Sequence, residues 1–165
     1  MQKIQLETKI AAPAERCFFL SLSIDLHVDS TASTRELAVG GVTTGLIGIG
    51  ESVTWRGRHF GFMLRHTSKI TRYEPPGFFQ DVMTTGIFTS FEHDHRFEQQ
   101  PNDQTVMKDE LRFSAPLGIL GVAAERLVLR NYLTRFLRER NAFVKEVAES
   151  DRWHEYLSKT DITLL

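Results

Sequence analysis

The sequence predicts an α+β fold in which one long, curved antiparallel sheet wraps a long helix near the C-terminal end. Two patterns predict it. Apolar residues recur at three- and four-residue steps between about residues 124 and 148, which indicates an amphipathic helix. Upstream, most of the chain alternates polar and apolar residues between turn signals, which is typical of strands with one buried face. At ~1.5 Å per residue the helix would be roughly 37 Å long, about the reach of a ten- or eleven-residue strand, so one sheet can cover it.

The helix carries an apolar stripe with one charged residue inside it. The stripe consists of Leu129, Leu133, Phe136, Phe143 and Val147, flanked by Tyr132, Leu137 and Val144. Arg140 falls on the same face, between Phe136 and Phe143. A guanidinium there needs an acidic partner or an opening to water. We expect Arg140 either to neutralise Asp81 or Asp109 inside the fold or to bind a carboxylate of a ligand.

The first fifty residues predict two strands and two short helices. Residues 2 to 10 alternate in polarity and form the first strand. Pro13 opens a short helix, and a second helical segment follows near residues 24 to 28. Residues 31 to 50 hold a short strand at 36 to 39 and five glycines. Such a glycine content predicts a mobile loop of the kind that forms a lid beside a pocket.

Five further strands bring the predicted sheet to about seven. They are expected at residues 51–58, 62–74, 78–85, 88–100 and 105–116. Turn residues separate them at 59–61, at Pro75-Pro76-Gly77, at Gly86 and at 101–103. Residues 116–121 then lead off the sheet into the long helix.

Length and composition indicate one domain with ordinary charge. We assign residues 1–150 to a single domain and 151–165 to a C-terminal tail, whose Trp153 and Tyr156 should dock on the outer face of the sheet or on the partner in a homodimer. Twenty basic and 21 acidic residues leave a net charge of −1, which predicts no nucleic-acid partner. No stretch reaches the ~18 apolar residues of a membrane span. The single cysteine and the strand-like N-terminus predict a cytoplasmic protein.

Four runs of sequence resemble a known superfamily. They are WRGRHFG at 55–61, ITRYEPPGFFQD at 70–81, GIFTSFEHDHRFE at 86–98 and DELRFSAPLGILG at 109–121. Together with the order of elements, they resemble the helix-grip fold of the START/Bet v 1-like (SRPBCC) superfamily and its bacterial members labelled cyclase/dehydrase-like or ligand-binding. The resemblance covers essentially the whole chain. It implies a cavity between the sheet and the C-terminal helix that binds a hydrophobic small molecule, with chemistry in only some members.

Two histidines and one aspartate are expected on the inner face of the sheet. In residues 91–98, His93 and His95 alternate with a charged set that belongs in water. In the next strand Asp109 is the lone carboxylate of an apolar set. A turn near residues 101 to 102 would place Asp109 opposite His93 or His95, and the sequence does not choose between them.

A carboxylate beside an imidazole raises its pKa and fixes its tautomer. Three interpretations of the trio therefore stay open: a structural pair, a contact that orients a ligand, and an acid–base pair for catalysis. A His-x-His spacing with a carboxylate could also hold a divalent metal, but no further ligand cluster supports it, so no metal and no cofactor is expected. His59 and His66 are expected at the rim at most, and His27 and His154 in solvent.

Apolar side chains and Arg140 are expected to line the cavity. The apolar set is Trp55, Phe62, Phe79, Met83, Phe88, Phe91, Phe97, Met107, Phe113 and Phe136. Twelve phenylalanines against three tyrosines favour an apolar lining, although a packed core would give the same composition. The leading hypothesis is therefore a binder of a hydrophobic small molecule. One alternative is a cyclase, dehydratase or isomerase that uses the His–Asp pair, and another is a non-catalytic interaction module with a filled core.

Overall fold

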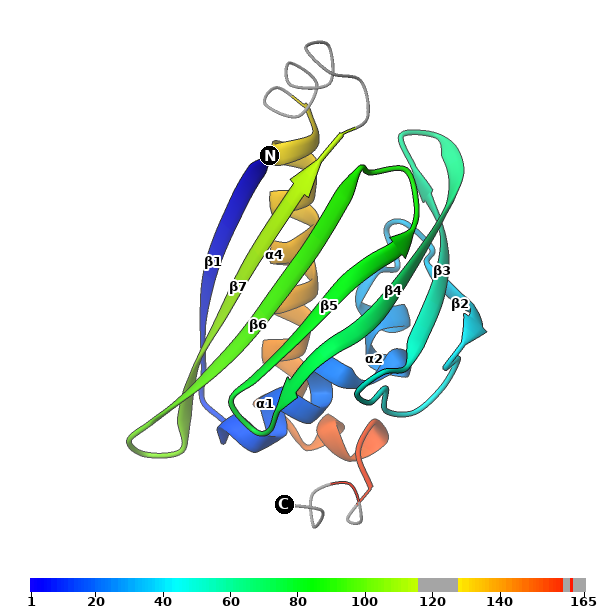
Figure 1. The fold of residues 1–165 in the computed structure, drawn as a ribbon. Coiled ribbons are helices and arrows are strands. Elements are labelled where there is room, and N and C mark those ends of the chain that lie inside the picture. Colours follow the sequence, from blue (N-terminus) through cyan, green and yellow to red (C-terminus); the bar gives the residue numbers. More distant parts are fainter. Residues whose placement is uncertain (116–127, 159–160, 162–165) are drawn as a thin grey trace.

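A computed structural model describes residues 1–115, 128–158 and 161. Seven strands form one antiparallel sheet in the order β1-β7-β6-β5-β4-β3-β2 (Figure 1). The strands are β1 (Gln2–Ile10), β2 (Leu37–Gly41), β3 (Ser52–His59), β4 (Phe62–Glu74), β5 (Phe78–Thr85), β6 (Ser90–Gln100) and β7 (Gln104–Ser114). The described helices are α1 (Ala14–Leu22), α2 (Ile24–Ser30), α4 (Arg130–Ala148) and the short 3-10 helix η2 (Asp151–Glu155).

The predicted fold class is confirmed: a curved seven-stranded sheet wraps a long C-terminal helix, and two short helices follow the first strand. Strands β2 to β7 follow one another as a meander, and β1 pairs with β7 at the far edge. In Figure 1, α4 lies along the inner face of the sheet, while α1 and α2 cover its lower end. The segment predicted to lead into the helix, and the predicted helix start at 124, lie outside the described residues.

The buried stripe of α4 differs from the predicted one. It consists of Leu133, Leu137, Arg140, Val144 and Val147, each at most 8% exposed, together with Asn141 and Ala148. The predicted members Phe136 and Phe143 are only half-buried. Phe136 faces the cavity described below, and Phe143 lies under the guanidinium of Arg152, 5.5 Å away. The stripe still follows three- and four-residue steps, so the periodicity was correct and its centre was wrong.

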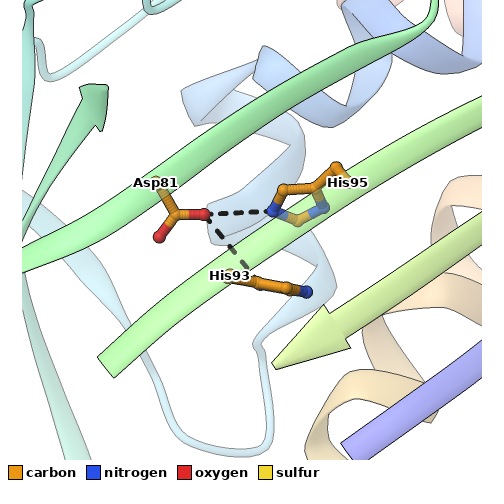
Figure 2. Close-up of side chains that lie close together, drawn as sticks. All are labelled: Asp81, His93 and His95. Atoms are coloured by element: carbon orange, nitrogen blue, oxygen red, sulfur yellow. Dashed lines mark hydrogen bonds and ion pairs between the residues drawn. The ribbon is translucent and has the colours of Figure 1, made fainter. Parts of the chain in front are cut away.

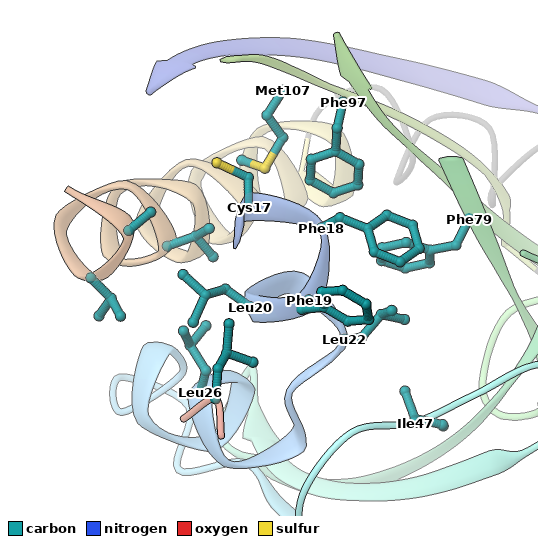
Figure 3. Packing of buried hydrophobic residues seen from close by; sticks show 14 of the residues in the cluster. Cys17, Phe18, Phe19, Leu20, Leu22, Leu26, Ile47, Phe79, Phe97 and Met107 are labelled. Atoms are coloured by element: carbon teal, nitrogen blue, oxygen red, sulfur yellow. The ribbon is translucent and has the colours of Figure 1, made fainter. Parts of the chain in front are cut away.

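The main apolar core lies where α1 and α2 pack on the lower half of the sheet. Phe18 of α1 is fully buried, and its ring contacts four others edge-on at 5.4 to 5.7 Å between centroids. These rings belong to Phe19, Tyr73, Phe79 and Phe97. Figure 3 shows this cluster extending from α1 to Ile47 on one side and Met107 on the other. The lower half of the fold is therefore filled by aromatic side chains.

Two local expectations are corrected by packing. The glycine-rich segment predicted as a mobile lid is anchored: the Ile47 amide donates to the Leu22 carbonyl at 3.2 Å, and Ile47 is buried. Asp94, expected in water, is 6% exposed because Arg112 and Gln80 hydrogen-bond its carboxylate from the neighbouring strands.

The part of the tail that the structure describes up to residue 158 contacts the short helices, where the outer face of the sheet was one of the expected docking sites. Leu157 is 3% exposed within the main core. The Tyr156 hydroxyl donates to Asp29 at 2.7 Å, and the Arg16 guanidinium lies 4.6 Å from the Trp153 ring centroid. Residues 151–158 therefore complete the core beneath α1 and α2.

Candidate functional site

A cavity of about 180 Å³ lies between α4, the inner face of the sheet and the α1–α2 junction. One water molecule needs only ~10–15 Å³, so the side chains of the described residues do not fill this space. Its exposed lining residues are Phe60 in the β3–β4 turn, Arg65 near the start of β4 and Ile87 in the β5–β6 loop, so the cavity opens at that end. The cavity argues against the interaction module with a filled core.

The structure places about half of the predicted lining residues at the cavity. Its walls include the predicted residues Trp55, Phe79, Phe88, Phe91, Phe136 and Arg140, and also His93 and His95. His66, expected at the rim, lines the wall as well and hydrogen-bonds Ser68 at 2.8 Å.

Five predicted lining residues do not contact the cavity. Phe62 is 71% exposed, because β4 begins there at the tip of a turn that extends beyond the sheet, and Phe60 lines the cavity in its place. Phe97 and Met107 point inward as predicted but lie in the part of the fold that α1 fills. Phe113 is fully buried beside Ile4 and Leu133.

Met83 is the fifth. Its sulfur lies over Gly86, where a Cβ would approach it to 2.5 Å. Strand alternation predicted which face these residues take but not the level along the strand at which the cavity begins.

Four polar residues from three adjacent strands meet at the inner end of the cavity. The β6–β7 register pairs His95 with Asp109, and the β5–β6 register pairs His93 with Asp81. Asp109 Oδ1 lies 2.9 Å from His95 Nδ1 and 3.0 Å from His93 Nε2, so it contacts both histidines that the sequence left as alternatives. Asp81 Oδ2 accepts a hydrogen bond from His95 Nε2 at 3.0 Å and lies 3.9 Å from His93 Nδ1 (Figure 2).

The contacts of Asp109 with the imidazoles are short but not aligned as hydrogen bonds. His93 Nε2, His95 Nδ1 and Asp109 Oδ1 are buried, and none has a hydrogen-bond partner among the described residues. The other Asp109 oxygen accepts a 2.6 Å hydrogen bond from Asn141 Nδ2. The Asp109 side chain is fully buried behind the histidines, whereas Asp81 is 18% exposed toward the cavity.

The cluster separates the protonation of its two histidines. Burial lowers the pKa of His93, and the neighbouring His95 lowers it further. Burial also acts to lower the pKa of His95, but contacts with Asp109 and Asp81 outweigh it and raise the pKa. Burial would raise the pKa of both aspartates, yet the imidazoles hold Asp81 at about 2 and Asp109 well below its usual range. The inner end therefore combines two imidazoles whose pKa values are shifted in opposite directions with two carboxylates of lowered pKa.

Arg140 is 5% exposed and balances this charge from α4. Its guanidinium donates to the Ser21 carbonyl and to Asn141 Oδ1, both at 3.3 Å, and lies 3.9 Å from Asp109 Oδ1. Asn141, which the sequence reasoning missed, connects this arginine to Asp109. A buried amide on the apolar face of a helix, beside a buried arginine, is the signal that could have found it.

A second polar cluster on the cavity wall was also missed. Glu36 contacts His27 Nε2 at 2.7 Å and His59 Nε2 at 3.0 Å, and His59 Nδ1 lies 2.6 Å from the Tyr132 hydroxyl. His27, expected in solvent, stacks on Trp55 at 4.1 Å. Gly57 makes room for this cluster, because a Cβ there would meet Glu36 Cγ at 2.6 Å. Burial would raise the pKa of Glu36, but the hydrogen bonds from both histidines outweigh it and lower the pKa to about 2.

The sheet, the gripped helix and the cavity between them define a helix-grip protein, the fold class that the sequence resemblance implied. Three solved structures share it over most of their length. A Thermus thermophilus protein matches with a TM-score of 0.69 at 16% identity, over 89% of this chain and 99% of its own. The ZhuI aromatase/cyclase from a Streptomyces species matches with a TM-score of 0.73 at 16% identity, over 90% and 93%. A START superfamily protein from Mycobacterium smegmatis matches with a TM-score of 0.67 at 11% identity, over 88% and 98%.

Identities this low show the shared fold alone. No family model and no curated protein matches the chain. None of the helices in the described parts of the chain is both long and apolar enough to cross a membrane.

Proposed function

We propose that this protein binds a hydrophobic small molecule whose polar group reaches the inner end of the cavity. The observation that carries the proposal is the division of the cavity into an apolar wall and a polar end. Trp55, Phe88, Phe91 and Phe136 supply the apolar wall, and the cluster around His95 supplies the polar end. Such an arrangement is typical of small-molecule sites, where a few convergent polar groups fix the orientation of an apolar ligand.

The charge balance of the polar end indicates the chemistry of the ligand. The two carboxylates, Asp81 and Asp109, face the guanidinium of Arg140 and the imidazole of His95, whose pKa their contacts raise. A group that already balances its own charge does not require a charged ligand. A carbonyl or hydroxyl group fits it best, because His95 can donate to it and Asp81 can accept from it.

The test is displacement of an environment-sensitive apolar dye, followed by native mass spectrometry for a co-purified organic molecule. The dye should bind one site per chain and be displaced by polycyclic or fatty compounds that carry a carbonyl or hydroxyl group. Absence of saturable binding by the folded protein would refute the proposal.

A matched pair of variants on β4 tests whether the dye binds in the cavity. Leu64 lines the cavity, whereas its neighbour Met63 is 60% exposed and does not. Leu64→Trp should therefore weaken dye binding at least tenfold, and Met63→Trp should leave it unchanged. Equal effects of the two variants would place the dye elsewhere.

A second candidate function is acid–base catalysis of the cyclase, dehydratase or isomerase type. The observation that favours it is the adjacency of His93, whose pKa is lowered, and His95, whose pKa is raised, because pKa values pushed apart in one site supply a base and an acid together. One structure of the same fold is an aromatase/cyclase.

Deuterium exchange tests this candidate without a known substrate. For a cyclic ketone that displaces the dye, the protein should accelerate deuterium incorporation at the carbon beside the carbonyl. His93→Gln should slow that exchange by ~10²–10⁴-fold. If no bound ketone exchanges faster than in buffer, the protein is a binder without this chemistry.

A further inference from the structure

Three metal-ligating side chains converge at the inner end of the cavity. Asp81, His93 and His95 each place one ligand atom within 4.8 Å of the other two, the only such group in the described part of the chain. The sequence showed the His-x-His pair, but its third partner, Asp81, comes from the neighbouring strand β5 and is brought in by the sheet register.

The spacing of these atoms suits one ion. Asp81 Oδ2 lies 3.0 Å from His95 Nε2 and 3.9 Å from His93 Nδ1. An ion with bonds of about 2.1 Å separates its ligands by roughly 3.4 Å in tetrahedral geometry and by about 3.0 Å in octahedral geometry. The observed separations span these values, so small side-chain rotations would complete the coordination.

The opposite side of each imidazole is held as in metal sites. The nitrogens that do not face Asp81, Nε2 of His93 and Nδ1 of His95, both lie within 3.0 Å of Asp109 Oδ1. Histidine ligands almost always direct their second nitrogen to a carboxylate, carbonyl or water, which fixes the ring and its tautomer. Asp109 lies where such a group would be for both rings, and the small rotations that complete the coordination could also align His93 Nε2 and His95 Nδ1, which now have no hydrogen-bond partner among the described residues, with its carboxylate.

We propose that Asp81, His93 and His95 bind one divalent transition-metal ion, with Asp109 positioning both histidines from behind. Two imidazole nitrogens and one carboxylate oxygen favour zinc, cobalt or iron over calcium and magnesium, which prefer oxygen ligands. The charge also fits once both imidazoles are neutral, as metal ligands must be, because Asp81 and Asp109 then outnumber the single guanidinium of Arg140 next to them.

The site would leave a coordination position open. All three ligands line the cavity, whereas Asp109 does not. An ion held by only three protein groups keeps a position for water or substrate, as catalytic zinc sites do. The open position would face the apolar space, where the ion could bind and polarise the carbonyl or hydroxyl group of a ligand. This inference goes beyond the proposed binding function and does not depend on it.

Cobalt and zinc titrations of the chelator-stripped, full-length protein test the proposal. One Co²⁺ per chain should bind with ligand-field absorption in the visible range, and Zn²⁺ should displace it. Mg²⁺ should not compete. Asp109→Asn should weaken Co²⁺ affinity ~10–100-fold, the usual effect of losing a group that positions a ligand. Asp81→Asn, His93→Gln and His95→Gln should each weaken it further.

His154→Gln is the control, because it removes an exposed histidine of η2 far from the cavity and should leave affinity unchanged. Thermal unfolding of each variant checks that it folds, and added Zn²⁺ should raise the unfolding temperature of the wild type and of His154→Gln, but not of the three ligand variants. The proposal is overturned if the stripped wild type shows no saturable Co²⁺ or Zn²⁺ binding, or if the three ligand variants bind as tightly as the wild type. Dye binding in the absence of metal is measured separately, so either proposal can fail alone.

Discussion

The imidazoles of His93 and His95 lie 3.8 Å apart between centroids on one strand, yet their surroundings move their pKa values in opposite directions. Both histidines are buried and both contact Asp109. The difference is Asp81, which hydrogen-bonds His95 but lies 3.9 Å from His93. Two carboxylates therefore act on His95 at short range, and its pKa lies above that of His93.

This asymmetry predicts a stability maximum near the unfolded histidine pKa of ~6.5 in the metal-free protein. The raised pKa of His95 contributes stability that is complete below pH ~6.5 and is lost as pH rises through the folded pKa. The lowered pKa of His93 acts in the opposite sense, because only the unfolded state takes up that proton as pH falls below ~6.5. Chemical denaturation across pH 5 to 9, at about unit intervals, measures both slopes.

Single substitutions separate the two slopes. His95→Gln should flatten the alkaline side of the stability profile, and His93→Gln the acid side. Asp109→Asn should reduce the alkaline slope and cost ~1–3 kcal/mol, because it leaves buried polar groups without their charged partner. Titration curves of both imidazoles by NMR should show the same order of pKa values. A higher pKa for His93 than for His95 would contradict the role given to Asp81.

Protonation of Glu36 should cause a separate loss of folding stability at acid pH. The pKa of Glu36 is about 2 in the fold and 4.5 ordinarily. The stability that its ionised form contributes is therefore complete above pH 4.5 and is lost as pH falls toward 2. A shift of this size corresponds to about 3 kcal/mol. Glu36→Gln should therefore lower the unfolding free energy at pH 7 and weaken its pH dependence between about 4.5 and 2. An unchanged acid limb in this variant would exclude Glu36 as its cause.

Replacing the buried Arg140 should lower stability more than replacing an exposed arginine of the same helix. Arg140→Met removes two hydrogen bonds and leaves the buried charge of Asp109 without its nearby guanidinium, so a loss of ~1–3 kcal/mol is expected. Arg135 lies on the same helix with its side chain 81% exposed, and its one ion-pair partner among the described residues is Glu139, so Arg135→Met should change stability by ~0.5 kcal/mol or less. Urea unfolding of both variants makes the comparison. Equal effects would mean that Arg140 is not coupled to the polar cluster.

Leu157, which follows α4 in the chain, is expected to stabilise the folded core. Leu157→Ala should lower the unfolding free energy by ~2–5 kcal/mol, as for other buried leucines, because Leu157 is 3% exposed within the main core. Glu155→Ala is the control, since its side chain is 59% exposed. Thermal and urea unfolding should agree on the difference. A neutral Leu157→Ala would show that residues 151–158 do not contribute to the folded core.

Features with a local cause could be predicted from the sequence. Side-chain alternation follows from the two-residue repeat of a strand, so it placed His93, His95 and Asp109 on the inner face. The turn after Gln100 set the register closely enough to bring Asp109 to the histidines. The apolar periodicity of α4 and the proline before α1 fixed the helical elements in the same way.

The tertiary structure alone decided where the inner face is filled and which distant residues join the site. Phe97 and Met107 face inward, but α1 packs over them. The cavity therefore begins near His95 and extends from there toward the β3–β4 turn. Asp81 and Asn141 reach the cluster from β5 and α4, and Glu36 meets His27 and His59 from three separate segments. These contacts depend on how a curved sheet and its helices pack together, which no periodicity within one element encodes.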